Sequence, residues 1–512
     1  MPTTSRNVLV AALLLGLAGD YLLRGAEWRL GFSAFLALAV GTALAIGGAV
    51  GRDRLLLLAG LCAAGLGLGV RDAEWVTVVD VLSVLCTGAL LVWLGSGKRL
   101  AELTVVQAIR AAVLAPLSLA AGAAVVLAGA SPAPDEAQAE QRAARVRAAV
   151  VGAVFAAPIL LLIGGLLSSS DVVFSRFLEA VAAFLGDRAL QHAVVVAAVA
   201  WVSAGWLRAT VAGGPPVRLP EEGNPGLPFL SVGVSLYGLL ALLTLFLGVQ
   251  ARALYGGSDY LLRTAGLTVA EYARQGFFQL VVASALVLGT LIAAEWALAS
   301  DDAEGRRRYR AVGTVLVALV AALLVSAAAR MGLYVQAFGL SVDRVTATSV
   351  MVWTLAALAT FGLTTLRGQA ARFAPAMLAV TVAWVVALNA LNLEAMIVRV
   401  NAGRAARGAL VDASARPGVH ATSPRFDAEY HAALSADALP ALLEAAPTLP
   451  AADCHRLAER LAGRWRLALV PVQDGLPGYD WRASGLARER ALAWARAGAQ
   501  VTCAPAAVNL PG

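Results

Sequence analysis

Long apolar runs, nearly free of charged side chains, recur along this chain of 512 residues. A helix needs roughly 20 apolar residues to cross the hydrocarbon core of a bilayer. Apolar residues make up 59% of the chain and charged residues 14%, against roughly 45–50% and about 25% in soluble domains. We therefore expect an all-α polytopic transmembrane helical bundle of about 12 spans and not a soluble enzyme. The runs are 8–23, 31–50, 55–70, 76–95, 103–129, 149–167, 189–208, 229–250, 270–298, 310–329, 345–365 and 374–396.

Polar segments divide these runs into blocks. From residue 397 onward no run reaches membrane length, and 23 of the 73 charged residues lie in those last 116 positions. Apolar residues recur there at three- and four-residue intervals over 426–434, 436–445, 452–469 and 486–497, which predicts short helices. The prediction is an N-terminal block of about five spans (1–130), a linker (131–148), a block of about seven spans (149–396) and a small soluble helical C-terminal domain (397–512).

Arginine placement predicts the orientation. The densest basic loop, 306–310, reads Arg-Arg-Arg-Tyr-Arg and should be cytoplasmic. The C-terminal domain then lies outside the cytoplasm, where Cys454 and Cys503 could form a disulfide. Only Lys98 among the 40 basic residues is a lysine, which is typical of a GC-rich bacterial genome. We expect a multi-pass protein of the bacterial cytoplasmic (inner) membrane.

A weak internal repeat points to a candidate site. Tyr260 and Tyr334 each precede a Gly-Leu-Thr/Ser-Val sequence that opens a helix, at 266–269 and 339–342. The glycine supplies a turn, the hydroxyl caps the helix, and an acid follows in the first turn. These features alone are explained by two well-capped helix starts with interfacial tyrosines. The alternative is that two related helix ends converge at the outer face to form a charged site, as in transporters built from repeats.

Polar residues at other span ends extend that candidate site. Asn389 and Asn392 recur with Met396 at helical spacing, so a shared face is expected, with amide bonding between spans as the simpler role. Asp171 ends a serine run just outside the sixth span. Asp20 and Asp80 lie near span ends and are expected to reach the interface. The predicted substrate-binding set is Asp171, Glu271, Arg274, Arg330, Tyr334, Asp343, Arg344, Asn389 and Asn392.

Signals for other chemistries are missing. The sequence contains no HExxH, GxSxG or GxxxxGK[ST] motif, so it favours a non-catalytic protein while leaving enzymatic activity open. The four histidines and four cysteines show no ligand spacing, and we expect no metal and no cofactor. The net charge of +7 reflects arginines that flank spans and does not indicate nucleic-acid binding.

Several stretches of this sequence resemble a bacterial family of polytopic membrane proteins known only as a domain of unknown function, family 4173, with its relative 4153. They are 157–158 with 166–174, then 271–280, then 326–327 with 330–331, 334 and 339–341, then 427–430 with 434–440, and last 480–482 with 488. The sequence departs from the family pattern at Ser170, where an alanine is expected, and at Gly485, where an asparagine is expected. The N-terminal 140 residues match only in general character. The resemblance implies the polytopic architecture and no activity.

Two functions follow as hypotheses. The first is binding or transport of a small solute, ion or lipid at the charged site. The second is a non-catalytic envelope sensor or assembly protein, whose C-terminal helical domain binds an envelope or membrane protein while the spans contact the lipid bilayer. A third, membrane-embedded acyl or glycosyl transfer, lacks any motif.

Overall fold

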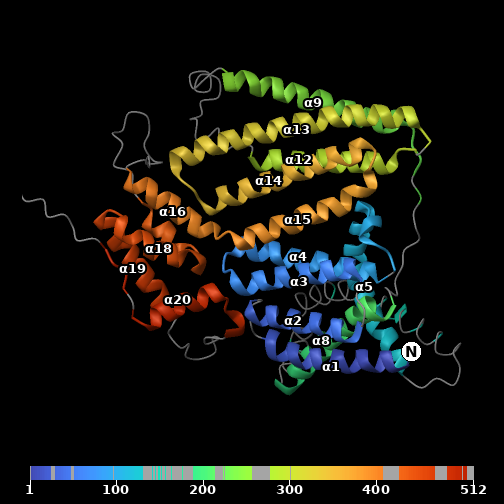
Figure 1. Ribbon diagram of the computed structural model, residues 1–512, viewed down its shortest axis with the longest axis horizontal. Helices are drawn as coiled ribbons and strands as arrows, with labels where there is room; N and C mark the ends of the chain where they lie inside the picture. Colours follow the sequence, from blue (N-terminus) through green and yellow to red (C-terminus); the bar gives the residue numbers. More distant parts are fainter. Residues whose placement is uncertain are drawn as a thin grey trace, which may run out of the picture. The chain divides into compact units, whose positions relative to one another are not determined.

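The computed structural model describes residues 2–24, 29–47, 51–95, 97–130, 188–213, 225–255, 277–299, 301–407, 426–467, 481–498 and 500–503, with single positions between 141 and 223. This part of the chain is helical throughout and has no strand, only an isolated bridge between Leu227 and Leu298 (Figure 1). The predicted all-α bundle is confirmed.

Eleven helices in the described ranges are long and apolar enough to cross a membrane. They coincide with eleven of the twelve predicted runs, and all but four positions of the sixth run, 149–167, lie outside the described residues. They are α1 (Pro2–Leu23), α2 (Leu30–Gly47), α3 (Arg52–Val70), α4 (Glu74–Leu94), α5 (Val105–Ala130), α8 (Arg188–Leu207), α9 (Phe229–Tyr255), α12 (Phe277–Ala297), α13 (Ala303–Phe338), α14 (Val342–Leu363) and α15 (Phe373–Ala390).

Large apolar side chains face outward along these helices. On α9, Leu230 is 78% exposed and Leu245 is 68% exposed. Apolar surface of this extent is unfavourable in water and marks a membrane or protein contact. Together with the lengths of the helices it identifies a multi-pass membrane protein.

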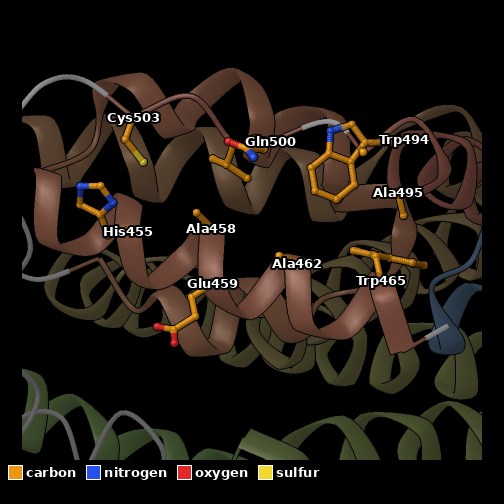
Figure 2. A pocket seen from close by; sticks show the side chains of 11 residues that line it. His455, Ala458, Glu459, Ala462, Trp465, Trp494, Ala495, Gln500 and Cys503 are labelled. Carbon is orange, nitrogen blue, oxygen red and sulfur yellow. The ribbon is translucent and has the colours of Figure 1, made fainter. Parts of the chain in front are cut away.

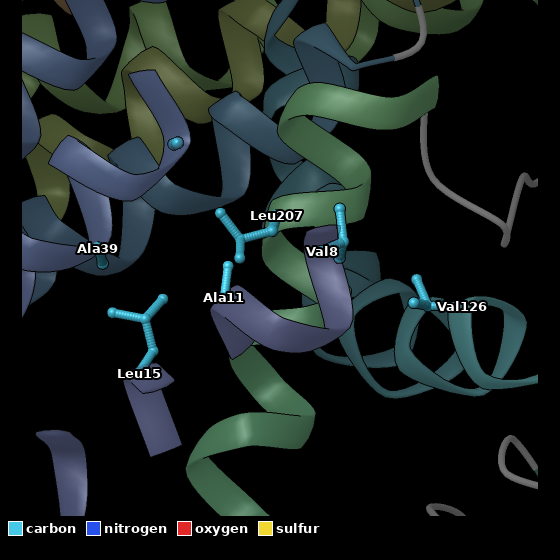
Figure 3. Close-up of a cluster of buried hydrophobic side chains, with 7 residues drawn as sticks. Val8, Ala11, Leu15, Ala39, Val126 and Leu207 are labelled. Carbon is cyan, nitrogen blue, oxygen red and sulfur yellow. The ribbon is translucent and has the colours of Figure 1, made fainter. Parts of the chain in front are cut away.

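The chain divides into two compact units: residues 1–220 with 471–489, and residues 221–470 with 490–512. In the first unit α1 packs on α2, α5 and α8, and α3 packs between α2 and α4. Val8, Leu15, Val126 and Leu207 belong to one buried cluster that joins α1, α2, α5 and α8 (Figure 3). Helices α5 and α8 approach so closely that a Cβ at Gly205 would lie 1.9 Å from the carbonyl oxygen of Leu119.

A segment from the C-terminal region completes the first unit. The short helix η7 (Trp481–Ala483) packs on α2, and the Leu30 amide donates to the Ser484 carbonyl at 3.2 Å. The predicted boundaries 1–130, 131–148, 149–396 and 397–512 stay predictions, because most of the linker lies outside the described residues.

In the second unit, α13 packs against α9, α12 and α14, and α15 packs against α14. The basic run 306–310 belongs to the first turns of α13 and not to a loop. Arg306 forms an ion pair with Glu295 at 3.0 Å. Tyr309 is fully buried and donates a hydrogen bond to the Leu291 carbonyl at 2.8 Å.

The twelfth predicted run, 374–396, is broken. Helix α15 ends at Ala390, and a new helix, α16 (Leu393–Ala406), begins after Asn392. The side-chain oxygen of Asn392 accepts from the Ala395 amide at 3.0 Å, so Asn392 is the N-cap of α16. The predicted shared face of Asn389, Asn392 and Met396 is therefore wrong, because a helical spacing has no meaning across a helix break.

The C-terminal region forms the predicted short helices. They are α17 (Ala428–Ala433), η5 (Ala436–Ala438), α18 (Leu439–Ala445), η6 (Ala446–Thr448), α19 (Ala451–Leu467) and α20 (Leu486–Arg496). Helix α17 packs on α19, and α18 packs on α16. Cys454 and Cys503 form a disulfide, which attaches the segment that follows α20 to the first turn of α19.

Candidate functional site

The turn between α13 and α14 is the centre of the most polar buried region in the described part of the second unit. Gly339 ends α13 with a φ of 75°, a conformation that favours glycine. Ser341 caps α14 by accepting from the Arg344 amide at 3.4 Å. The Arg344 guanidinium donates to the carbonyls of Phe338 at 3.1 Å and Gly339 at 2.5 Å and lies 4.2 Å from the centre of the Tyr334 ring. Arg344 therefore closes the turn.

The side chain of Asn401 in α16 forms hydrogen bonds with the backbone of this turn. Its Oδ1 accepts from the Leu340 amide at 2.8 Å, and its Nδ2 donates to the Leu340 carbonyl at 2.8 Å. Asn401 is only 4% exposed, so both of these bonds are protected from water. The pair of bonds also fixes the orientation of the amide, since a flipped amide would direct its NH₂ group at the Leu340 N–H.

His431 of α17 accepts the second proton of that amide. The distance from Asn401 Nδ2 to His431 Nε2 is 3.0 Å, and Nδ1 of the imidazole lies 2.6 Å from the Asp427 carbonyl. Nε2 must accept and Nδ1 must donate, so the imidazole is neutral with its proton on Nδ1. The ring stacks on Phe426 with 4.1 Å between centroids, and burial lowers the pKa of His431.

Tyr430 supplies a second contact to the same turn. Its hydroxyl accepts from the Val342 amide at 2.8 Å. The Val342 amide is one of the first N–H groups of α14, which have no partner within the helix. Burial raises the pKa of Tyr430. We refer to Leu340, Val342, Asn401, Tyr430 and His431 together as the junction.

A second row of contacts joins the start of α16 to the C-terminal helices. Glu394 is 6% exposed, and its Oε2 accepts from the amide of Ser435 at 2.8 Å and from its hydroxyl at 2.5 Å. Asn392 Nδ2 donates to the Asp437 carbonyl at 2.7 Å. A buried carboxylate group needs hydrogen bonds to offset its lost hydration, and Ser435 supplies two of those that Glu394 makes.

The structure brings only two of the predicted site residues into contact, and Asn392 is the N-cap of α16 described above. Arg344 and Tyr334 come together, and both belong to the turn. Arg330 is half-buried one helical turn before Tyr334, whereas Asp343 is exposed. Asn389 donates to the Val385 carbonyl of its own helix at 3.1 Å. Asp171, Glu271 and Arg274 lie outside the described residues, as does the first copy of the repeat at 260–269, so convergence of the two motifs stays a prediction.

No residue of the junction was in the predicted site, including the three that contribute side chains: Asn401, Tyr430 and His431. Their signal in the sequence is weak. Asn401 belongs to a polar group just after the last span, and His431 has no ligand spacing. Each residue acquires its role from a partner at least 30 positions away, which no local pattern reveals.

The fold and this site together define a polytopic membrane protein with a hydrogen-bonded junction between a span turn and C-terminal helices. The chain belongs to the family described as a domain of unknown function (DUF4153), whose model matches residues 55–445. The predicted relation to family 4153 is confirmed and reaches further toward the N-terminus than the sequence comparison indicated, whereas a relation to family 4173 stays a prediction. No curated protein and no solved structure matches this chain.

Proposed function

We propose that this protein is a non-catalytic sensor or assembly protein of the cell envelope. Its C-terminal helices bind a partner or ligand, and the junction transmits the resulting movement of these helices to the spans. The observation that carries the proposal is the Asn401 side chain. It bonds at once to the α13–α14 turn and to His431 of α17. A movement of α17 therefore breaks the bond from Asn401 to His431 and the bond from the Val342 amide to Tyr430, both at the turn between two spans.

The disulfide supports a location of this region outside the cytoplasm. Disulfides persist in oxidising compartments and are rare in the cytosol, and Cys454 and Cys503 are bonded. The predicted placement in a bacterial inner membrane, with the C-terminal helices outside, is part of this proposal. Single cysteines at exposed positions test it, with Cys62 and Cys86 replaced by alanine. Glu444→Cys should label with an impermeant thiol reagent in intact cells, whereas Arg307→Cys should label only after lysis. The reverse pattern contradicts the placement.

The sensor model is tested by breaking the junction without removing the region. The double variant Asn401→Ala, Tyr430→Phe should fail to restore the phenotype of a deletion strain while its membrane abundance stays near that of the wild type. The matched control is Arg399→Ala, on the same helix as Asn401. It removes only an exposed ion pair with Glu444 of α18 and should restore the phenotype fully. Full function of the double variant would refute the model.

Transport of a small solute or ion is the second candidate, and one observation favours it. Asp80 lies within α4 and is 0% exposed, so it does not reach the interface as the sequence suggested. Carboxylates buried in spans are costly and are typical of transport pathways. Asp80→Asn keeps the shape of the side chain and removes its charge. Loss of the phenotype in Asp80→Asn, with the junction variant active, would favour transport over sensing.

A further inference from the structure

A cavity of about 410 Å³ lies between α19 on one side and the end of α20 with residues 498 and 500–503 on the other. Its volume falls within the range of small-molecule sites, roughly 300–1000 Å³. Figure 2 shows Ala458 and Ala462 on the face of α19 that is directed at this segment. Their one-carbon side chains leave the space between the two walls open.

Two indoles form one end of the cavity. Trp465 comes from α19 and Trp494 from α20, and Figure 2 shows both near the same end, with Cys503 toward the other. Trp465 is 4% exposed, so packing holds its indole in place and only part of the ring borders the cavity. An indole offers a flat, electron-rich apolar face, which favours a ligand that has an apolar face of its own.

Polar groups line the rest of the wall. His455 and Gln500 belong to the lining, and Gln500 is on the segment that the disulfide fixes to α19. An amide both donates and accepts, and an imidazole does so in its neutral form. Both side chains are exposed, so they can turn toward a polar ligand at the mouth of the cavity.

We infer that this cavity binds a small saccharide of one or two sugar rings. A sugar ring carries one face of C–H bonds, which is attracted to the negative face of an indole. Its hydroxyl groups lie at the ring edge, where they can pair with the amide of Gln500 and the imidazole of His455. The combination of two indoles with these polar groups matches both parts of such a ligand.

A contact leads from the cavity toward the junction. The Arg464 guanidinium lies 5.1 Å from the Trp465 ring centre. It donates to the carbonyl of Ala432 at 2.7 Å and also to that of Leu434. Both carbonyls lie at the end of α17, which carries Tyr430 and His431. The saccharide as a signal rests on the proposed function, whereas its binding in the cavity does not.

The test is calorimetric titration of the full-length protein in lipid nanodiscs with two probes, N,N′-diacetylchitobiose and cellobiose. We expect saturable binding of at least one. Ala462→Phe fills the cavity and should abolish binding, whereas Ala452→Phe, at an exposed position of the same helix, should bind like the wild type. Trp494→Ala removes one of the two indoles from a half-buried position, so the affinity should fall about tenfold.

Three results would overturn the inference. The first is absence of saturable binding of both probes up to about 10 mM, a concentration that detects very weak complexes. The second is equal binding of a probe by the wild type and Ala462→Phe. The third is saturable binding of a proline-rich peptide that Ala462→Phe abolishes, with no binding of either saccharide. The cavity contains no residue of the junction. Failure of saccharide binding therefore leaves the junction test of the proposed function intact.

Discussion

Replacing Asn401 by alanine removes three hydrogen bonds, two to the backbone of Leu340 and one to Nε2 of His431. Each buried polar group that loses its partner costs about 1–3 kcal/mol. Leu340 is half-buried, so water can replace part of its two bonds and the lower end of that range applies to them. We expect Asn401→Ala to destabilise the docked arrangement by about 2–4 kcal/mol.

Hydrogen exchange of the 339–345 segment measures this cost directly, because the Leu340 amide is itself a donor in the lost pair. A destabilisation of about 2–4 kcal/mol corresponds to roughly 30- to 700-fold faster exchange by local opening. The control is Arg399→Ala, whose exposed ion pair is worth less than about 1 kcal/mol. Exchange of the segment in Asn401→Ala within threefold of that control, about 0.6 kcal/mol, would refute the reasoning.

Three further perturbations test other parts of the structure. Burial lowers the pKa of His431, so the unfolded state takes up the proton more readily. The contribution of His431 is then complete above about pH 6.5 and declines as the pH falls below that value. His431→Gln should flatten the decline of the melting temperature between about pH 7 and pH 5, and an unchanged profile contradicts the assignment. Cys503→Ser opens a disulfide with a sequence separation of 49, which should cost about 4 kcal/mol and make 481–503 sensitive to protease at unchanged membrane abundance; equal resistance would contradict this. Gly205→Ala should force α5 and α8 apart at a cost of about 1–3 kcal/mol and lower the membrane abundance of the protein. A Cβ at Gly41 meets nothing within 4 Å, so the control variant Gly41→Ala should be neutral. Equal membrane abundance of the two variants would contradict this close packing.

The spans could be predicted from the sequence because length and apolarity alone satisfy a bilayer. The local features of the α13–α14 turn were equally accessible, since Ser341 caps the residues that follow it and Gly339 permits the turn. The junction could not be predicted in the same way. The roles of Asn401 and His431 depend on partners brought together by folding. The local sequence around an asparagine near a span end does not show whether its side chain bonds to lipid headgroups, to water or to Leu340.

At Asn392 the local apolar pattern predicts a continuous helix, whereas contacts with distant residues stabilise a break. The apolar pattern favours a helix that continues to residue 396, yet Asn392 both caps α16 and donates to the Asp437 carbonyl. The break is therefore stabilised by the C-terminal helices that α16 contacts. If these helices moved away, Glu394 would lose the hydrogen bonds from Ser435, and Asn401 would lose the one to His431. Because such losses are costly, the C-terminal helices of this unit are not an independent appendage. A ligand can separate them from the turn only to the extent that it binds the undocked state more tightly than the docked one.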